Sequence, residues 1–173
     1  DMSAVINSSL DFKHILTTLT RDLGQSFKAR GVSVMLLDED GKTLKTVAAD
    51  GIDDAFFSAE VLAKDQSIAK TLAGETLLIT DAANAKDVFD PTIFKNQKIT
   101  SILSVPIKSG ALVSGVLRLY FGAAKTFYPD EIMMINAFAL QAGLAIQNTA
   151  CFVSLENEHK DLKDDIWSHR SWF

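Results

Sequence analysis

The aspartates between residues 81 and 90 are the densest group of side chains that could bind a cation. Asp81, Asp87 and Asp90 stand in a polar stretch. Their spacing matches no standard calcium loop, and we interpret them as a solvated loop face. The sequence also contains no Ser/His/Asp order, no glycine-rich phosphate loop and no His/Asp metal cluster. We therefore expect no metal site, no catalytic residues and no enzymatic activity.

Histidine and cysteine could supply a haem ligand, a metal ligand or a nucleophile. His14 lies in the first predicted helix, and His159 and His169 lie in the last. We expect each of them on a surface or in a helix seam. The single cysteine, Cys151, excludes an internal disulfide and fits a reducing compartment, so we expect a cytoplasmic protein.

Composition narrows the class of protein further. The chain has 173 residues, of which 47% are hydrophobic and 23% charged, as in ordinary globular domains. The net charge of −5 disfavours binding to nucleic acid or to an anionic membrane. No apolar run reaches the length of a membrane span. Because the chain opens at Asp1, we expect it to be part of a longer protein. We also expect that protein to carry a downstream output domain beyond the C-terminal helical segment.

The elements that must position any site are organised around Thr100 to Gly122, two β-rich runs separated by a break at Gly110. This pattern predicts an antiparallel hairpin covered on both faces, in the middle of a sheet. A helix over residues 8–27, opened by a capping box at Ser8 and Asp11, and a hairpin over residues 32–49 precede it. A long helix beginning at Pro129 follows it.

Residues 52–100 form a long crossover with weak structural signals. We predict a short helix from Ser67 to Ala73 with Ser67 as its N-cap, a short strand from Leu77 to Ile79, and a helix from Pro91 to Asn96. Long irregular segments inside compact domains often form a lid or one wall of a binding site.

The C-terminal segment has a different character. Residues 156–165 are nearly all polar or charged, but one apolar stripe continues at alternating spacings of three and four, which is typical of a two-stranded coiled coil. We predict a homodimer seam at Phe152, Leu155, His159, Leu162 and Ile166. We divide the chain into a domain at residues 1–152 and a helical linker at residues 153–173.

Several stretches in fixed order carry a family resemblance. They are Ser9-Leu10-Asp11 with Ile15-Leu16, Val34 to Gly41, Ser67 to Glu75 with Ile79-Thr80-Asp81, Ser101 to Ile107 with Gly115-Val116-Leu117, and Phe127 to Ala145. Together they resemble the GAF domain family over roughly Ser8 to Phe152. The resemblance implies an α+β fold with a central antiparallel sheet and helices on both faces. It also implies a regulatory module of a bacterial-type signalling protein.

The resemblance also bears on the ligand. A cyclic-nucleotide subgroup carries Asn-Lys where this chain has Tyr120-Phe121-Gly122. Bilin and haem sites need a cysteine or histidine near the pocket, and the GAF-like methionine sulfoxide reductases need several thiols. We therefore expect a colourless protein that binds neither cyclic GMP nor cyclic AMP tightly, and we name no cofactor.

By family analogy, a small-molecule pocket lies between the crossover and the central hairpin. The residues that we predict to line it are Asp81, Phe94, Thr100, Ser101, Leu103 and Val105. The alternative is that Phe94, Leu103 and Val105 are simply core. A ligand-free dimerisation domain is the alternative function, and a GAF-like enzyme is the third.

Overall fold

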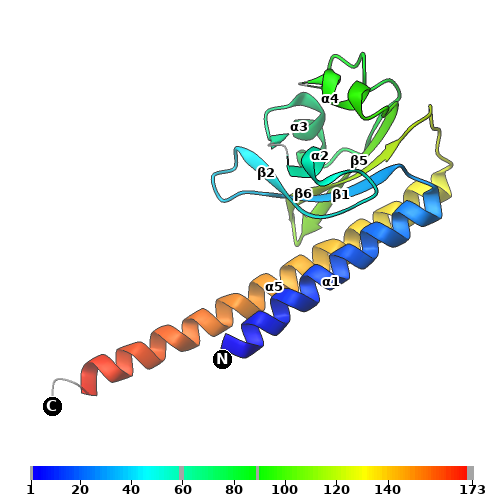
Figure 1. Ribbon diagram of the computed structural model, residues 1–173. Helices are drawn as coiled ribbons and strands as arrows, with labels where there is room; N and C mark the ends of the chain where they lie inside the picture. The colour runs from blue at the N-terminus through cyan, green and yellow to red at the C-terminus, as the bar shows by residue number, and fades with distance from the viewer. Residues whose placement is uncertain (1, 59–60, 89, 171–173) are drawn as a thin grey trace.

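The computed structural model describes residues 2–58, 61–88 and 90–170, with side chains described between residues 10 and 149. Its centre is a six-stranded antiparallel sheet with strand order β3-β2-β1-β6-β5-β4. Two long helices, α1 and α5, lie side by side across one face, and the short helices α2, α3 and α4 lie over the other (Figure 1). This arrangement confirms the predicted α+β fold.

The elements follow the chain in a simple order. The strands are β1 (Gly31–Leu37), β2 (Thr43–Asp50), β3 (Val61–Leu62), β4 (Leu77–Ile79), β5 (Ser101–Ser109) and β6 (Leu112–Phe121). The helices are α1 (Met2–Phe27), α2 (Asp54–Ser58), α3 (Gln66–Leu72), α4 (Pro91–Asn96) and α5 (Pro129–Arg170).

Both predicted hairpins are present. Strands β1 and β2 pair around a turn in which Gly41 adopts a φ of 70°, a conformation that glycine reaches without strain. Strands β5 and β6 pair from Ser101 opposite Phe121 to Ser109 opposite Leu112. Because β6 also pairs with β1, the two hairpins join into one sheet with β6 at its middle.

The helix starts depart from prediction where capping was inferred from a weak signal. Helix α1 begins at Met2, so the interpretation of Ser8 and Asp11 as its capping box is wrong. Helix α3 begins one residue earlier than predicted, because the carboxylate of Asp65 accepts a hydrogen bond from the main-chain N–H of Ser67. Asp65, and not Ser67, is therefore its N-cap.

The helix starts at the two prolines are as predicted. Helix α4 begins at Pro91 and α5 begins at Pro129, with Asp130 and Glu131 in the first turn of α5. The side chain of Glu131 accepts a hydrogen bond from the N–H of Tyr128, which secures the start of α5.

Side chains alternate between the two faces of the central strands. Residues 103, 105 and 107 of β5 and residues 117, 119 and 121 of β6 pack in one core with α1 and α5. Ile102 and Tyr120 pack in a second core under the crossover, and Met35 and Val116 pack in a third. The sheet is therefore covered on both faces, and the two faces have separate cores.

Helix α5 is continuous from Pro129 to Arg170 and runs well past the sheet (Figure 1). The proposed division at residue 152 falls inside this helix and stays a prediction. The five predicted seam residues, Phe152, Leu155, His159, Leu162 and Ile166, lie outside the residues whose side chains are described. No helix in the described ranges combines the length and hydropathy needed to cross a membrane.

Candidate ligand pocket

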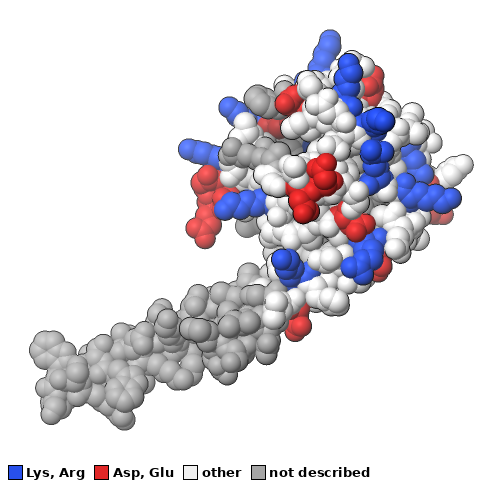
Figure 2. Space-filling view, viewed as in Figure 1, with Lys and Arg blue, Asp and Glu red and all other residues white. Residues whose placement is uncertain are grey.

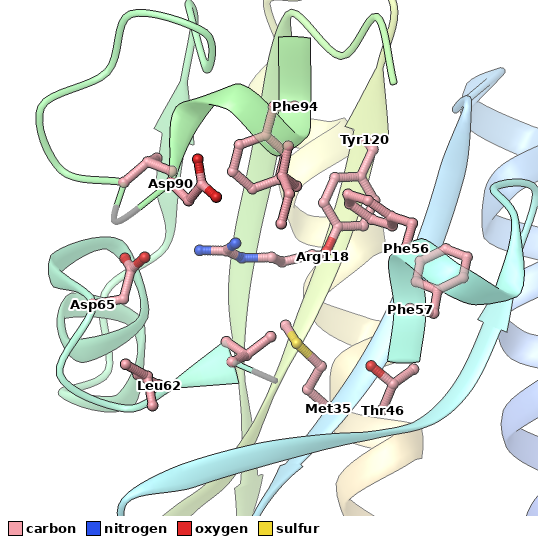
Figure 3. Close-up of a pocket in the computed structure, with 13 residues that line it drawn as sticks. Met35, Thr46, Phe56, Phe57, Leu62, Asp65, Asp90, Phe94, Arg118 and Tyr120 are labelled. Atoms are coloured by element: carbon pink, nitrogen blue, oxygen red, sulfur yellow. The ribbon is translucent and has the colours of Figure 1, made fainter. Parts of the chain in front are cut away.

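A cavity of about 240 Å³ lies between the sheet and the short helices of the crossover (Figure 3). Strands β1, β2 and β6 form its floor, and α2, β3, α4 and the adjoining loops form its walls. The lining residues are Met35, Thr46, Phe56, Phe57, Val61, Leu62, Asp65, Val88, Asp90, Ile93, Phe94, Arg118 and Tyr120. The lining is mostly apolar with a few charged groups, which is typical of small-molecule sites.

Four aromatic side chains form one end of the pocket. The ring of Phe56 meets the ring of Tyr120 edge to face at 5.3 Å between centroids, and it meets Phe94 at 6.0 Å. Phe57 packs against both Phe56 and Tyr120. The hydroxyl of Tyr120 lies 3.1 Å from the buried hydroxyl of Ser33, which anchors the ring to β1. These contacts give a rigid aromatic surface from three separate elements.

Arg118 is the most unusual residue of the pocket. It lies in the middle of β6 and is only 4% exposed. Its Nε donates to the hydroxyl of Ser104 at 3.2 Å, and its Nη2 donates to the hydroxyl of Ser67 at 2.6 Å. Within the described residues, Nη1 makes no hydrogen bond. The buried cation therefore has two neutral acceptors, and one end of its fork faces the cavity (Figure 3).

Two aspartates lie beyond the tip of Arg118, one from each neighbouring short helix. Asp65 caps α3 and also accepts a hydrogen bond from the hydroxyl of Ser67 at 2.6 Å. Asp90 caps α4 by accepting from the N–H of Thr92 at 3.1 Å. Figure 3 shows the guanidinium directed toward the space between these two carboxylates. One end of the pocket thus carries a positive charge and two negative charges, and the other end is aromatic.

Of the six residues predicted to line a pocket, Phe94 lines this one. Leu103 and Val105 lie on the opposite face of the sheet, in the core with α1 and α5. The reason is the alternation of β5: its odd-numbered residues face the long helices, and Ile102 and Ser104 face the crossover. Leu103 and Val105 are therefore helix-side core residues.

The other three predicted residues lie outside the lining. Thr100 donates its hydroxyl hydrogen to the carbonyl of Gly122 at 3.2 Å. Ser101 donates to the carbonyl of Ala123 and accepts from the N–H of Lys125. Both thus hold the segment after β6. Asp81 is exposed and accepts a hydrogen bond from Asn84.

Sequence reasoning missed Arg118, Tyr120, Asp65 and the two phenylalanines of α2. The sequence did contain a signal for Arg118, which is the single charged residue in the apolar run of β6. Charged side chains are seldom buried unless they have a specific partner or role. Nothing in the sequence assigned the face of the sheet on which that charge lies.

Asp87, another aspartate of the crossover, has a structural partner. Asp87 pairs with Lys70 at 2.9 Å, and this hydrogen bond and the carboxylate's charge raise the pKa of Lys70 above its ordinary value of 10.5. In the described part of the chain, no three His, Cys, Asp or Glu side chains converge as they would around a metal ion. Lys and Arg are scattered over the face drawn in Figure 2 and intermixed with Asp and Glu.

The chain was compared with protein-family models, with curated proteins and with solved structures. A family model described as "GAF domain" matches residues 11–146. The solved structure of a GAF domain/HD domain protein from Geobacter sulfurreducens is similar, with a TM-score of 0.72, 15% identity, and coverage of 85% of this chain and 98% of that one. The comparison with curated proteins found no significant match.

Two further similar structures have different described activities. One is the blue-light absorbing form of the Thermosynechococcus elongatus PixJ GAF-domain, with a TM-score of 0.69, 17% identity, and coverage of 91% and 96%. The other is a type II free methionine-R-sulfoxide reductase from Thermoplasma acidophilum, with a TM-score of 0.69, 14% identity, and coverage of 82% and 96%. At these identities the likeness concerns the fold alone.

Proposed function

This chain belongs to the GAF domain family, and from that premise we propose that it is a regulatory sensor domain of a signalling protein. Its ligand is a small molecule that binds in the pocket between the sheet and the crossover. Binding is relayed to the long terminal helices. The observation that carries this proposal is the buried guanidinium of Arg118, whose open end faces the cavity.

A purely structural role accounts poorly for Arg118. Removing a charged group from water is costly unless hydrogen bonds and opposite charge compensate. Ser67 and Ser104 satisfy one side of the fork, but they are neutral, and the carboxylate of Asp65 is linked to the guanidinium through the hydroxyl of Ser67. No ion pair joins Arg118 to Asp90 among the described residues. A ligand group at the free end of the fork would complete the hydrogen bonding of this cation.

The sheet offers a short route from the pocket to α5. Arg118 and Tyr120 form part of the floor, while their neighbours Leu117 and Leu119 face the opposite side and pack in one core with Ile135. Strand β6 carries both the pocket residues and the core residues that face α5. A shift of β6 on ligand binding therefore changes the surface on which α5 lies. The relay proposed here is a small rigid displacement of that helix.

Native mass spectrometry of freshly purified protein tests whether the pocket holds a ligand. Thr46→Phe fills the cavity from β2, and Thr43→Phe places the same ring on the same strand outside the lining. We expect a bound small molecule in the wild type and in Thr43→Phe, and its loss in Thr46→Phe. A wild-type protein with neither a copurified molecule nor a thermal shift from any metabolite tested would contradict the proposal.

A second candidate function, homodimerisation, is supported by the outer surface of α5. Met133, Leu140 and Leu144 are 70%, 58% and 51% exposed, and spacings of seven and four residues put them on one side of the helix. Such a group of exposed apolar side chains marks an interaction surface. We propose that two copies of α5 pair in parallel along this surface and the predicted seam from Phe152 to Ile166.

Sedimentation equilibrium tests this dimer. Leu140→Glu and Leu162→Asp should each weaken it. Leu112→Glu is the control, because Leu112 is an apolar side chain that is 76% exposed but belongs to β6 and not to α5. If all three variants and the wild type sediment as the same species, α5 is not the interface.

We also propose that the domain is not an enzyme, is cytoplasmic, and binds neither haem, bilin nor cyclic nucleotides tightly. The single cysteine supports the absence of sulfoxide reductase activity, because one thiol cannot serve both as the nucleophile and as the resolving thiol. Turnover of free methionine sulfoxide, a visible absorption band after expression with haem or bilin, or micromolar cyclic-nucleotide binding would each contradict it.

A further inference from the structure

The arrangement of charges in the pocket restricts the chemistry of the ligand. We propose that the pocket takes a free amino acid with a large apolar side chain, its carboxylate on Arg118, its ammonium group on Asp90, and its side chain against the aromatic end. This inference rests on the proposed function and names the ligand class of the same pocket. It follows from three separate features of the lining.

The first feature is the guanidinium itself. Nε donates to Ser104 and Nη2 to Ser67, which fixes the plane of the group, and Nη1 makes no hydrogen bond within the described residues. The guanidinium lines the cavity and is directed toward the space between Asp65 and Asp90 (Figure 3). A planar fork held in this way matches a carboxylate better than any neutral group does. The position of Arg118 in the middle of β6 also places this contact deep in the pocket.

The second feature is the pair of carboxylates. Asp65 and Asp90 line the same cavity as Arg118, so the lining carries two negative charges and one positive charge. A simple anion would meet repulsion from both aspartates. A ligand that carries an ammonium group beside its carboxylate places each charge next to its opposite. Asp90 is exposed at the pocket, where the ammonium group reaches it without deep burial of both charges.

The third feature is the size and lining of the opposite end. The cavity of about 240 Å³ is smaller than a typical drug-sized site of roughly 300–1,000 Å³. Phe56, Phe57, Phe94 and Tyr120 enclose its apolar end. This surface favours one aliphatic or aromatic side chain. L-Leucine and L-phenylalanine are the probes that follow.

Isothermal titration calorimetry on the whole chain tests the inference. L-Leucine is compared with isocaproate, which lacks the amine, and with isoamylamine, which lacks the carboxylate. L-Phenylalanine is compared with hydrocinnamate and phenethylamine in the same way. We expect at least one amino acid to bind, and each of its truncated analogues to bind at least about tenfold more weakly, because a charged hydrogen bond is lost.

Two aspartate variants separate the effect of the negative charge at Asp90 from the effect of a change in the protein's net charge. Asp90→Asn keeps an N-cap for α4, since asparagine caps as well as aspartate, but removes the negative charge. It should weaken amino-acid binding at least about tenfold and leave isocaproate or hydrocinnamate unchanged or tighter. Asp81→Asn changes net charge equally at an exposed crossover position outside the lining, and should bind as the wild type does.

The outcomes distinguish this inference from the proposed function. If isocaproate or hydrocinnamate binds as tightly as its parent amino acid, or Asp90→Asn binds as the wild type does, the amino-acid assignment is overturned. If native mass spectrometry finds a different class of molecule that Thr46→Phe displaces, the assignment falls and the sensor function stands. If no probe binds and no copurified molecule is found, both fall.

Discussion

Ser67 is the residue whose removal tests the polar network of the pocket most directly. Its hydroxyl is fully buried, accepts a hydrogen bond from Arg118 at 2.6 Å and donates one to Asp65 at 2.6 Å. Ser67→Ala removes both bonds in one step. The main-chain N–H of residue 67 still donates to Asp65, so the N-cap of α3 is retained.

The expected cost follows from the charges at both ends of this link. A hydrogen bond to a charged group contributes about 1.5–3 kcal/mol, and a buried charge that loses its partner is penalised further. Arg118 retains Ser104, and Asp65 is only half-buried, so the two losses are not fully additive. We expect Ser67→Ala to lower the free energy of unfolding by about 2 kcal/mol.

Urea denaturation followed by circular dichroism measures this change. With a slope of about 1–3 kcal/mol per molar urea, a loss of about 2 kcal/mol moves the midpoint down by roughly 1 M. Ser109→Ala is the matched control, because Ser109 makes a half-buried hydrogen bond to the neutral Ser114 at 2.9 Å. That variant should lose less than about 1 kcal/mol.

The comparison of the two variants decides the outcome. Equal midpoints for Ser67→Ala and Ser109→Ala would refute the view that the guanidinium depends on Ser67. A Ser67→Ala variant that is more stable than the wild type would show that the desolvation penalty of the buried polar groups exceeds the stabilisation from their hydrogen bonds. Amino-acid binding measured on the same protein should weaken, since the orientation of Arg118 is then less restricted.

Two further predictions concern packing and charge outside the pocket. A Cβ at Gly143 would overlap the main-chain oxygen of Lys108, so Gly143→Ala should lower the free energy of unfolding by about 1–3 kcal/mol, measured by thermal or urea unfolding. Gly24 lies in α1, and a Cβ added there would meet Asp50 and Val32 at ordinary van der Waals distances, so Gly24→Ala should raise the free energy of unfolding by up to about 1 kcal/mol. Equal effects at both sites would contradict the close approach of α5 to β5. The pair of Lys70 with Asp87 raises the pKa of Lys70, so its contribution to stability is present below pH 10.5 and lost as the pH rises through the higher folded-state pKa. The difference in unfolding free energy between the wild type and Lys70→Met should therefore shrink well above pH 10.5, and a difference that stays constant would contradict this.

Local sequence determined the elements of this protein and their order. The Asp-Gly turn at Gly41 and the break at Gly110 each require a positive φ, and both glycines adopt one. Pro91 and Pro129 open helices because proline is favoured in a first turn. Signals of this kind depend only on near neighbours, so they survive in the sequence. Their order was sufficient to indicate the GAF domain family.

The two predicted helices that lack such a signal, α1 and α3, begin at other residues than expected. Several residues could cap α3, and the choice of Asp65 over Ser67 depends on how the loop before α3 approaches it. The start of α1 was likewise placed too late, because a helix that lies along α5 gains stability from tertiary contact in addition to local capping.

Tertiary structure alone decided which residues meet in the pocket. Strand β5 is apolar on consecutive residues because both of its faces are covered, so its pattern does not tell the helix side from the crossover side. A shift of one residue exchanges the faces, and for this reason Leu103 and Val105 lie in the core with α1 and α5. Arg118, Asp65 and Asp90 line one cavity only because β6 and the starts of α3 and α4 converge across long stretches of chain. A cavity lined by residues so far apart in the sequence leaves no local pattern from which to predict it.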